Sequence, residues 1–429
     1  MKTILLIEDD KLFREPTAAL LRGADWQVLE AGDGESGLAL ALAHRPEVIL
    51  CDLMMPRGNG YQLCRAVRQH PEMAGTRIIM LTGRDYPTDR RSAQEAGADD
   101  YLVKPLVFSV LEAALARVLK NGSAAAQPEA PGSGSTRLRL WGVRGSIPTP
   151  GPGTVFFGGN TSCVEVRADG EIVILDAGTG IRPLGDALAA EFGGAPILVS
   201  LLITHTHWDH IQGFPFFLPA YDSKNRVRIF GVQGARARLS STLEGQMESP
   251  YFPIALAQMP GHIEFVEILE RQAQIGSIRV EVCQSIHEGL TVGYRLFTAA
   301  GSIAYLPDNE TFNERSAGIA GKEKEALRHR QLLDFIRGAD VLICDAQYDS
   351  EEYQRHIGWG HGCVDDVVHF AIAGGVGRLY LFHHDPSHDD RKVSSMLIHA
   401  RALAREAGSE LRIEAAREGE ELAIVPRAG

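Results

Sequence analysis

Four side chains that could bind metal ions stand close together in the segment THTHWDH: His205, His207, Asp209 and His210. The segment directly follows the apolar run at 197–203, which predicts a buried strand. Imidazole nitrogens bind Zn²⁺, Mn²⁺ and Fe ions alike, and a carboxylate beside a histidine supplies what a second ion needs. Histidine-rich loops also occur on protein surfaces without any metal. Four potential ligands so close together after a strand instead indicate a site for two divalent metal ions.

Other polar residues at the ends of apolar, strand-like runs can complete such a site. Any one of them is usually a helix cap or a turn former. Together with the THTHWDH segment, they supply the further imidazole and carboxylate ligands that two metal ions require. These residues are Asp176, His287, Asp308, and the neighbouring pair His383 and His384.

The first part of the chain carries a second group of this kind. Its polar residues follow four separate apolar runs, so in a parallel sheet they would meet in one crevice. An acidic cluster binds Mg²⁺, an aspartate can accept a phosphoryl group, and a lysine and a hydroxyl can hold its oxygens. Each acid could instead cap the helix that follows it, but four strand ends in this order favour a phosphoryl site. The residues are Glu8, Asp9, Asp10, Asp52, Thr82 and Lys104.

Residues 1–120 alternate between short apolar runs and stretches with apolar residues at helical spacing. The runs predict strands at 3–7, 48–50, 77–81 and 100–103. The stretches between them predict helices at 11–22, 34–44, 59–69 and 106–119. This alternation predicts an α/β domain with a doubly wound parallel sheet, which places the polar strand ends along one edge.

A linker and a second domain are expected to follow. Residues 121–136 contain no large apolar side chain and are rich in Gly, Ser, Ala and Pro, which is typical of a flexible linker. A new globular pattern begins at 137 and continues to 429. Of the 15 histidines, only His44 and His70 precede the linker, so the histidine chemistry belongs to the second domain.

The composition is that of a globular protein with a sizeable core, since 45% of the 429 residues are hydrophobic and 23% are charged. No apolar run approaches the ~18 residues of a membrane span, and the N-terminus lacks the pattern of a signal peptide. Six cysteines without a CxxC pair predict free thiols and a cytoplasmic protein. The formal net charge of -12 argues against nucleic acid as a partner.

Residues 1–120 closely resemble the response-regulator receiver family. The resemblance is carried by IEDD, by Asp52 in CDLMMPRGNG, by LTG and by AGADDYLVKP. It implies a five-stranded parallel sheet and phosphorylation of Asp52 by a sensor histidine kinase or a phosphotransfer protein, with a homodimer as one route of signalling. It also implies roles for individual residues: Mg²⁺ held by Glu8, Asp9 and the backbone carbonyl of Met54, a switch pair of Thr82 and Tyr101, and a phosphoryl contact from Lys104.

Residues 137–429 resemble the metallo-β-lactamase fold superfamily, in particular the branch with RNase Z and the cyclic phosphate phosphodiesterases. The motifs are GGNTSCVEV, ILDAGTGIRPLG, THTHWDHIQGFPFF, IAYLPDNE, ICDAQY and GWGHG. The implied fold is a four-layer αβ/βα sandwich with two metal ions at the rim of its sheets, Zn²⁺ by preference and Mn²⁺ or Fe as alternatives. The implied ligands are His205, His207 and His287 for one ion, Asp209, His210 and His383 for the other, Asp308 between them, and Asp176 behind the ligand loop.

The same branch places a catalytic histidine with an acidic residue behind it. In this chain these would be His361 in GWGHG and Asp345 in ICDAQY. The branch usually has Ser or Thr after this histidine, whereas Gly362 follows here, so a plain helix-cap role for His361 stays open. His384 is an alternative ligand to His383, which we prefer because it directly follows the strand.

The chemistry implied is hydrolysis of a phosphodiester, with Asp209 in the catalytic set and His361 protonating the leaving group. Because the domain is acidic, a small diester such as a cyclic nucleotide is favoured over RNA. Aromatic residues after the THTHWDH segment either form a cap that stacks on a base or belong to the core. They are Phe214, Phe216, Phe217, Tyr251 and Phe252.

Two other functions stay open. The same fold could hydrolyse a lactone, thioester or sulfate ester, although the pairing of Asp345 with His361 favours phosphoesters. The domain could also be a non-catalytic docking module for phosphorelay partners, although its complete ligand set argues against this. In either enzymatic reading, phosphorylation of Asp52 is expected to set the activity or the assembly of the protein.

Overall fold

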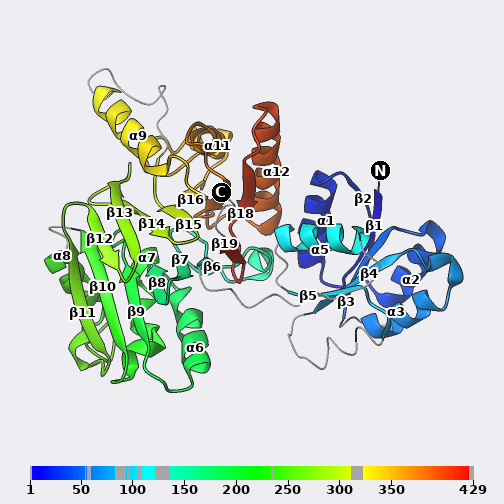
Figure 1. Cartoon of the computed structure of the whole chain (residues 1–429), viewed down its shortest axis with the longest axis horizontal. Helices are drawn as coiled ribbons and strands as arrows, with labels where there is room; N and C mark the ends of the chain where they lie inside the picture. Colours follow the sequence, from blue (N-terminus) through cyan, green and yellow to red (C-terminus); the bar gives the residue numbers. More distant parts are fainter. Residues whose placement is uncertain are drawn as a thin grey trace. The chain divides into compact units, whose positions relative to one another are not determined.

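A computed structural model shows the chain as two compact units (Figure 1). None of the helices in the described residues combines the length and hydropathy that a membrane crossing needs. The expected linker at 121–136 lies outside the described residues except for Thr136, which begins a strand. The structure describes residues 2–53, 55, 59–82, 93, 96–104, 108–120, 136–232, 236–310 and 322–424.

The first unit is built on a five-stranded parallel sheet in the order β2-β1-β3-β4-β5. Its strands are β1 (Lys2–Ile7), β2 (Trp26–Ala31), β3 (Val48–Asp52), β4 (Arg77–Thr82) and β5 (Asp100–Val103). Its described helices are α1 (Lys11–Gly23), α2 (Gly34–His44), α3 (Gly60–Arg68), the 3-10 turn η1 (Pro71–Met73) and α5 (Phe108–Lys120). The doubly wound parallel sheet is thereby confirmed. Strand β2 was not marked by its pattern because it is a half-exposed edge strand without a continuous apolar run.

Helix caps explain where the helices of this unit begin. The side chain of Asp10 accepts a hydrogen bond from the backbone N–H of Leu12 at 2.9 Å and starts α1. Asn59 and Gln62 form a capping box at the start of α3. Asp10 is therefore a cap, whereas its neighbours Glu8 and Asp9 lie at the strand end.

The second unit contains two seven-stranded mixed sheets. The first has the order β11-β10-β9-β8-β7-β6-β19, and its strands are β6 (Thr136–Gly142), β7 (Cys163–Ala168), β8 (Glu171–Leu175), β9 (Leu198–Leu202), β10 (Arg226–Val232), β11 (His262–Ile268) and β19 (Glu421–Ile424). The second has the order β12-β13-β14-β15-β16-β17-β18, and its strands are β12 (Gln272–Ile275), β13 (Ile278–Gln284), β14 (Val292–Thr298), β15 (Gly301–Leu306), β16 (Val341–Asp345), β17 (Arg378–Phe382) and β18 (Arg412–Ala415).

Helices cover the outer faces of these sheets (Figure 1). An inner core joins apolar side chains of both sheets, such as Val166 and Ile303. An outer core places α6 and α8 against the first sheet, and α9 and α11 contact the second. This is the sandwich expected from the sequence. The described helices and 3-10 turns are η2 (Pro152–Thr154), α6 (Ile181–Phe192), α7 (Trp208–Ile211), η3 (Phe214–Phe216), η4 (Leu218–Tyr221), α8 (Arg236–Gln246), η5 (Leu256–Gln258), α9 (Lys322–Ile336), α10 (Ser350–Tyr353), α11 (Val364–Ala373) and α12 (Asp390–Glu406).

Candidate metal centre

The candidate site lies where strands of both sheets end. The ends of β8, β9, β13, β15, β16 and β17 lead into short loops, and each loop carries at least one of the polar residues expected from the sequence. Because the two sheets face each other, these loops meet at one rim. They bring together Asp176, His205, His207, Asp209, His210, His287, Asp308, Asp345, His361 and His383.

Three histidines and one carboxylate oxygen form the first half of the cluster. Nε2 of His287 lies 3.2 Å from Nδ1 of His207. Oδ2 of Asp308 lies 3.6 Å from Nε2 of both His205 and His287. All four donor atoms are within 4.8 Å of one another. His207 is exposed, so this half of the cluster opens to solvent.

The other half is buried and is formed by Asp209, His210, His383 and the second oxygen of Asp308. Oδ1 of Asp308 lies 3.0 Å from Nε2 of His210 and 3.3 Å from Nε2 of His383. Oδ2 of Asp209 lies 3.1 Å from Nε2 of His383 and also accepts a hydrogen bond from the backbone N–H of Ser146 at 2.8 Å. Asp308 thus directs one carboxylate oxygen to each half.

The donor atoms fit two divalent metal ions. Nε2 of His205 is buried and has no hydrogen-bond partner, an arrangement that is costly unless another ligand satisfies it. Burial and the neighbouring imidazoles hold the pKa of His205 well below its usual range, which keeps the ring neutral, as metal binding requires. Burial alone would raise the pKa of Asp308, but the surrounding histidines outweigh it and hold that pKa well below its usual range.

A further layer of hydrogen bonds orients the ligand rings. Oδ2 of Asp176 lies 2.8 Å from Nδ1 of His210 and accepts a hydrogen bond from Tyr305 Oη at 3.0 Å. The backbone carbonyl of Gly360 lies 2.9 Å from Nδ1 of His287. Since these oxygens can only accept, each Nδ1 must donate, and in the neutral ring Nε2 then presents a lone pair to the cluster.

The structure places His383 rather than His384 in the cluster. Nδ1 of His383 lies 3.0 Å from Oε1 of Gln347, and the residue has a left-handed φ of +61°, a strained conformation often found at functional sites. His384 turns away, with Nε2 2.8 Å from the carbonyl of Ala416. Burial and the nearby Arg144 lower the pKa of His384 to about 3.

His361 and Asp345 form a pair beside the cluster. Nδ1 of His361 lies 2.8 Å from Oδ2 of Asp345, and its ring stacks on that of His383 with 5.0 Å between centroids. Burial lowers the pKa of His361, but Asp345 outweighs it and raises that pKa to about 9. A Cβ at Gly362 would lie 2.2 Å from the carbonyl oxygen of Asp345. The glycine is therefore required by the close approach that brings His361 to Asp345.

The turn after β15 connects these parts, and motif reading did not reveal its role. Asn309 accepts a hydrogen bond from the backbone of Ile286 at 3.0 Å and donates its own backbone N–H to Asp345 at 3.2 Å. The buried carboxylate of Glu310 accepts three hydrogen bonds, from Tyr353 Oη at 2.7 Å, Gly358 N at 2.8 Å and Gly360 N at 2.9 Å. Both residues stand in the PDNE segment, but the sequence of this segment does not indicate which groups they hydrogen-bond.

The strand ends of the first unit also converge as expected. Nζ of Lys104 lies 2.6 Å from Oε2 of Glu8 and 2.8 Å from Oδ1 of Asp52. Oxygens of Glu8, Asp9 and Asp52 lie within 4.8 Å of one another, a donor set that suits Mg²⁺. Burial raises the pKa of Glu8 to about 7. Thr82 is buried at the end of β4, and Tyr101 is buried as the second residue of β5, while Met54 lies outside the described residues.

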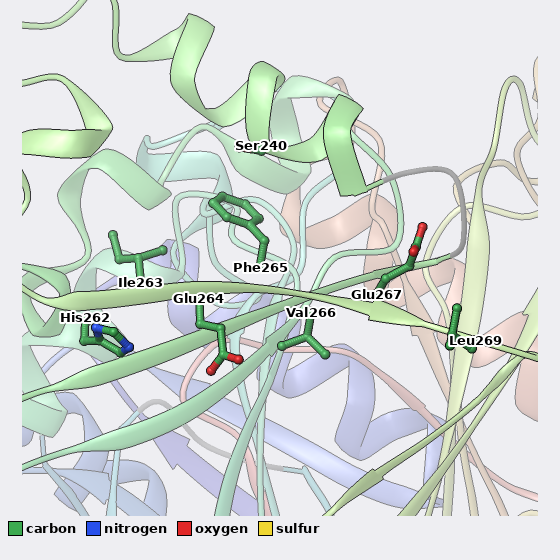
Figure 2. Close-up of a pocket in the computed structure, with 8 residues that line it drawn as sticks. All are labelled: Ser240, His262, Ile263, Glu264, Phe265, Val266, Glu267 and Leu269. Carbon is green, nitrogen blue, oxygen red and sulfur yellow. The ribbon is translucent and has the colours of Figure 1, made fainter.

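The aromatic residues that could have formed a cap divide into two groups. Phe214 and Phe217 are fully buried in the outer core, so they are not available for stacking on a base. Phe216 and Tyr251 are exposed, and Phe216 packs edge-on against Phe252 with 5.4 Å between ring centroids. An open groove of about 930 Å³ lies along β11 and α8, and its lining residues, labelled in Figure 2, include none of the metal-cluster residues.

Two family models match separate parts of the chain. The model of the response regulator receiver domain matches residues 4–116, and that of the beta-lactamase superfamily domain matches residues 172–384. The transcriptional regulatory protein AfsQ1 of Streptomyces coelicolor is 38% identical over 122 residues, which are 28% of this chain and 53% of AfsQ1. This chain thus spans about half of AfsQ1.

Two further comparisons cover a larger share of the matched protein. The transcriptional regulatory protein CseB of Streptomyces avermitilis is 32% identical over 216 residues, or 49% of this chain and 83% of CseB. The metallo-beta-lactamase fold protein YhfI of Bacillus subtilis is 14% identical, with a TM-score of 0.49 over 67% of this chain and 99% of YhfI.

The fold and the site define a receiver-type sheet joined to a metallo-β-lactamase-fold sandwich. This fold implies divalent metal ions and supports a metal-dependent hydrolase, and receiver domains bind Mg²⁺. The chain belongs to the response-regulator family and carries a beta-lactamase superfamily domain as its second part.

Proposed function

We propose that the second domain is a phosphodiesterase with two divalent metal ions, that its substrate is a small phosphodiester such as a cyclic nucleotide, and that phosphorylation of Asp52 regulates it. The observation that carries the catalytic part is the position of the Asp345–His361 pair against the cluster. The ring of His361 lies 5.0 Å from that of His383 and 5.1 Å from that of His287, so one proton donor faces both halves. A purely structural metal site has no need of such a pair.

The residues of the chain have separate tasks in this reaction. His205, His207 and His287 would hold one ion, and Asp209, His210 and His383 the other, with Asp308 between them. When bound, the two ions lower the pKa of a water molecule and neutralise charge on the phosphoryl oxygens.

Protonation of the leaving oxygen is the task of His361, which Asp345 assists. Because Nδ1 of His361 is held by Asp345 at 2.8 Å, Nε2 is the nitrogen that faces the site and carries the transferable proton. The attacking water loses one proton to solvent and adds to phosphorus as hydroxide. As the bond to the leaving oxygen breaks, Nε2 gives its proton to that oxygen and later regains one from solvent. Asp345 stabilises the charged ring before the transfer and fixes its orientation throughout.

The proposal is tested by assaying the full chain, loaded with Zn²⁺ or Mn²⁺, against bis-p-nitrophenyl phosphate and a panel of cyclic mono- and dinucleotides. We expect metal-dependent turnover in the wild type and a loss of at least about 10²-fold in Asp209→Ala. A lactone, a thioester and a sulfate ester complete the panel. No turnover of any phosphodiester, or turnover confined to another ester, would overturn the assignment.

Regulation is proposed to begin in the acidic crevice of the receiver domain. Asp52 is nearly buried beside Lys104 and within reach of Glu8 and Asp9, which provides the oxygens for Mg²⁺ and a cation for the incoming phosphoryl group. A phosphohistidine on a sensor kinase or phosphotransfer protein would be the donor. Its P–N bond breaks as a P–O bond forms at the carboxylate of Asp52.

A phosphoryl mimic should reveal this regulation. With beryllofluoride and Mg²⁺, the wild type is expected to change its hydrolysis rate by about fivefold or more, or to change its molar mass in solution. The Asp52→Asn variant should respond in neither measurement, because it lacks the acceptor carboxylate. Steady-state kinetics and light scattering check both outcomes. Identical rates and masses for the treated wild type and the variant would contradict the regulatory role of Asp52.

A further inference from the structure

Exposed hydrophobic side chains occur on the loops of the candidate metal centre. Several of its loops carry a large, exposed hydrophobic side chain close to a residue of the site. The indoles of Trp208 and Trp359 are 72% and 61% exposed, whereas Trp141 is buried. Leaving an indole in water forfeits much of the free energy that its burial provides. Each of the two exposed indoles neighbours a residue linked to the open half of the cluster, since Trp208 follows His207 and Trp359 precedes Gly360, whose carbonyl holds His287. The rim residues are Ile147, Trp208, Leu290, Ile357 and Trp359.

Trp208 stands at the open half of the cluster. It lies in the chain between His207 and Asp209, one residue from each half, and it begins helix α7. His207 is the exposed ligand candidate, so a substrate that reaches the cluster from solvent passes this loop.

Trp359 is presented by a loop that is rigidly held. Both of its neighbours, Gly358 and Gly360, have a left-handed φ of +83°, and both donate their backbone N–H to the buried carboxylate of Glu310. The indole packs edge-on against His356, with 4.7 Å between ring centroids. The carbonyl of Gly360 holds His287, so the loop that exposes the indole also orients a ligand of the open half. Such preorganisation reduces the entropic cost of binding a flat partner.

The described parts of these loops carry few cationic side chains that could bind a polyanionic partner. A protein that follows a phosphate backbone needs several free lysines or arginines. In the described loops around the site, the cationic side chains other than histidine are Arg144 and Arg355. Arg144 is buried and donates to the carbonyls of Gly158 and His388, and Arg355 pairs with Glu351. The loops are 143–162, 176–180, 204–213, 285–291, 307–310, 346–363 and 383–389.

A small cavity adjoins the same half of the cluster. It has a volume of about 240 Å³ and is lined by His205, His207 and apolar side chains that include Val232 and Leu290. Pockets for drug-sized ligands are typically ~300–1,000 Å³. The cavity therefore suits a single ring or a short apolar group beside the reacting phosphate.

We propose that Trp208 and Trp359 bind the nucleobase of the substrate by stacking, so that the phosphodiesters hydrolysed here are nucleotides. This inference rests on the proposed function and names its substrate class. Indole faces stack on any base, and the contact gains most where both surfaces leave water. A base held at the rim places its phosphate over the open half of the cluster, where His205, His207 and His287 lie.

The proposal is tested with two substrates that share the reacting group. One is a 2′,3′-cyclic nucleotide, and the other is glycerol cyclic phosphate, a five-membered cyclic diester without a base. In Trp208→Ala and Trp359→Ala, KM for the nucleotide is expected to rise about 5- to 100-fold with kcat largely kept. KM for the base-free diester should be unchanged. Trp208→Phe and Trp359→Phe, which keep a flat ring, should restore most of the affinity, and Leu269→Ala controls for loss of an exposed apolar side chain elsewhere.

A binding measurement separates this proposal from that of phosphodiesterase activity. Titration of the metal-free chain with the same cyclic nucleotide should quench tryptophan fluorescence, and the double alanine variant should lose the effect. If the wild type hydrolyses both diesters and the variants affect them equally or not at all, the base subsite is wrong and the phosphodiesterase stands. If neither diester turns over but the quench depends on both indoles, the subsite stands alone. Absence of indole-dependent binding, or variants that change only self-association, overturns it.

Discussion

Replacing Asp308 with alanine is expected to reduce bound metal from two ions per chain to one or none, and to lower phosphodiester turnover by about 10³-fold or more. The reason is the division of its carboxylate. Oδ1 lies 3.0 Å from Nε2 of His210, and Oδ2 lies 3.6 Å from Nε2 of His205. These distances place one oxygen of Asp308 at each half of the cluster. Its loss also leaves mutually repelling imidazoles without the anion that offsets them.

Metal analysis of the dialysed protein and initial rates at saturating Zn²⁺ check this prediction together. Asp308→Asn is the matched variant, because it keeps the shape of the side chain and one carbonyl oxygen. We expect it to bind one ion per chain and to lose the second. Asp334→Ala, which removes an exposed aspartate from α9, should retain both ions and full turnover. Two tightly bound ions in Asp308→Ala would show that each half of the cluster is complete without it.

The receiver site could be anticipated from the sequence because its geometry follows from topology. Glu8, Asp52 and Lys104 each end a strand, and parallel neighbouring strands end at one edge, so their convergence needs no knowledge of packing. The role of Asp10 was not equally plain. A carboxylate at a strand end and one at a helix N-cap look alike in sequence, and only the hydrogen bond to Leu12 separates them.

The sequence also indicated which residues lie together in the cluster, but not how their atoms are arranged within it. THTHWDH supplies several donors from one loop, and the remaining ligand candidates follow other strands. Which oxygen of Asp308 faces which half depends on how two sheets approach, and no local pattern records this. Backbone partners are equally hidden: the carbonyl of Gly360 that holds His287 is a group that every residue possesses. Gly362 was read as a departure from the family pattern, whereas packing against Asp345 requires it.

The aromatic residues show where pattern reading fails for physical reasons. Phe214 begins the 3-10 turn η3, and Phe217 lies between η3 and η4. These turns are too short for a periodicity that would mark a buried face. In the sequence, Trp208 stands between metal-binding residues and no pattern marks a role for it. Its exposure becomes informative only when the neighbouring loops are seen to carry apolar side chains as well.

Replacing His361 with alanine should slow the reaction by an amount that depends on the leaving group. For a cyclic nucleotide the leaving group is an alkoxide, which needs a proton, so kcat is expected to fall about 10²–10⁴-fold. For bis-p-nitrophenyl phosphate the leaving phenolate is stable without a proton, and the loss should be about tenfold or less. Asp345→Asn should show the same substrate dependence in weaker form, because the ring stays in place without its charged partner.

Metal content decides between proton donation and metal ligation for this residue. A donor atom of His361 lies within 4.8 Å of those of Asp308 and His383, close enough for the ring to act as a ligand. If His361 is the proton donor, His361→Ala keeps two ions per chain, and only the alkoxide-leaving substrates are strongly affected. If His361 is a ligand, the variant loses bound metal, and the hydrolysis rates of both substrates fall by the same factor. His262→Ala, an exposed histidine on β11, should change neither rate nor metal content. Equal losses on both substrates with metal retained would leave His361 without the proposed role, because a positional defect does not distinguish one leaving group from another.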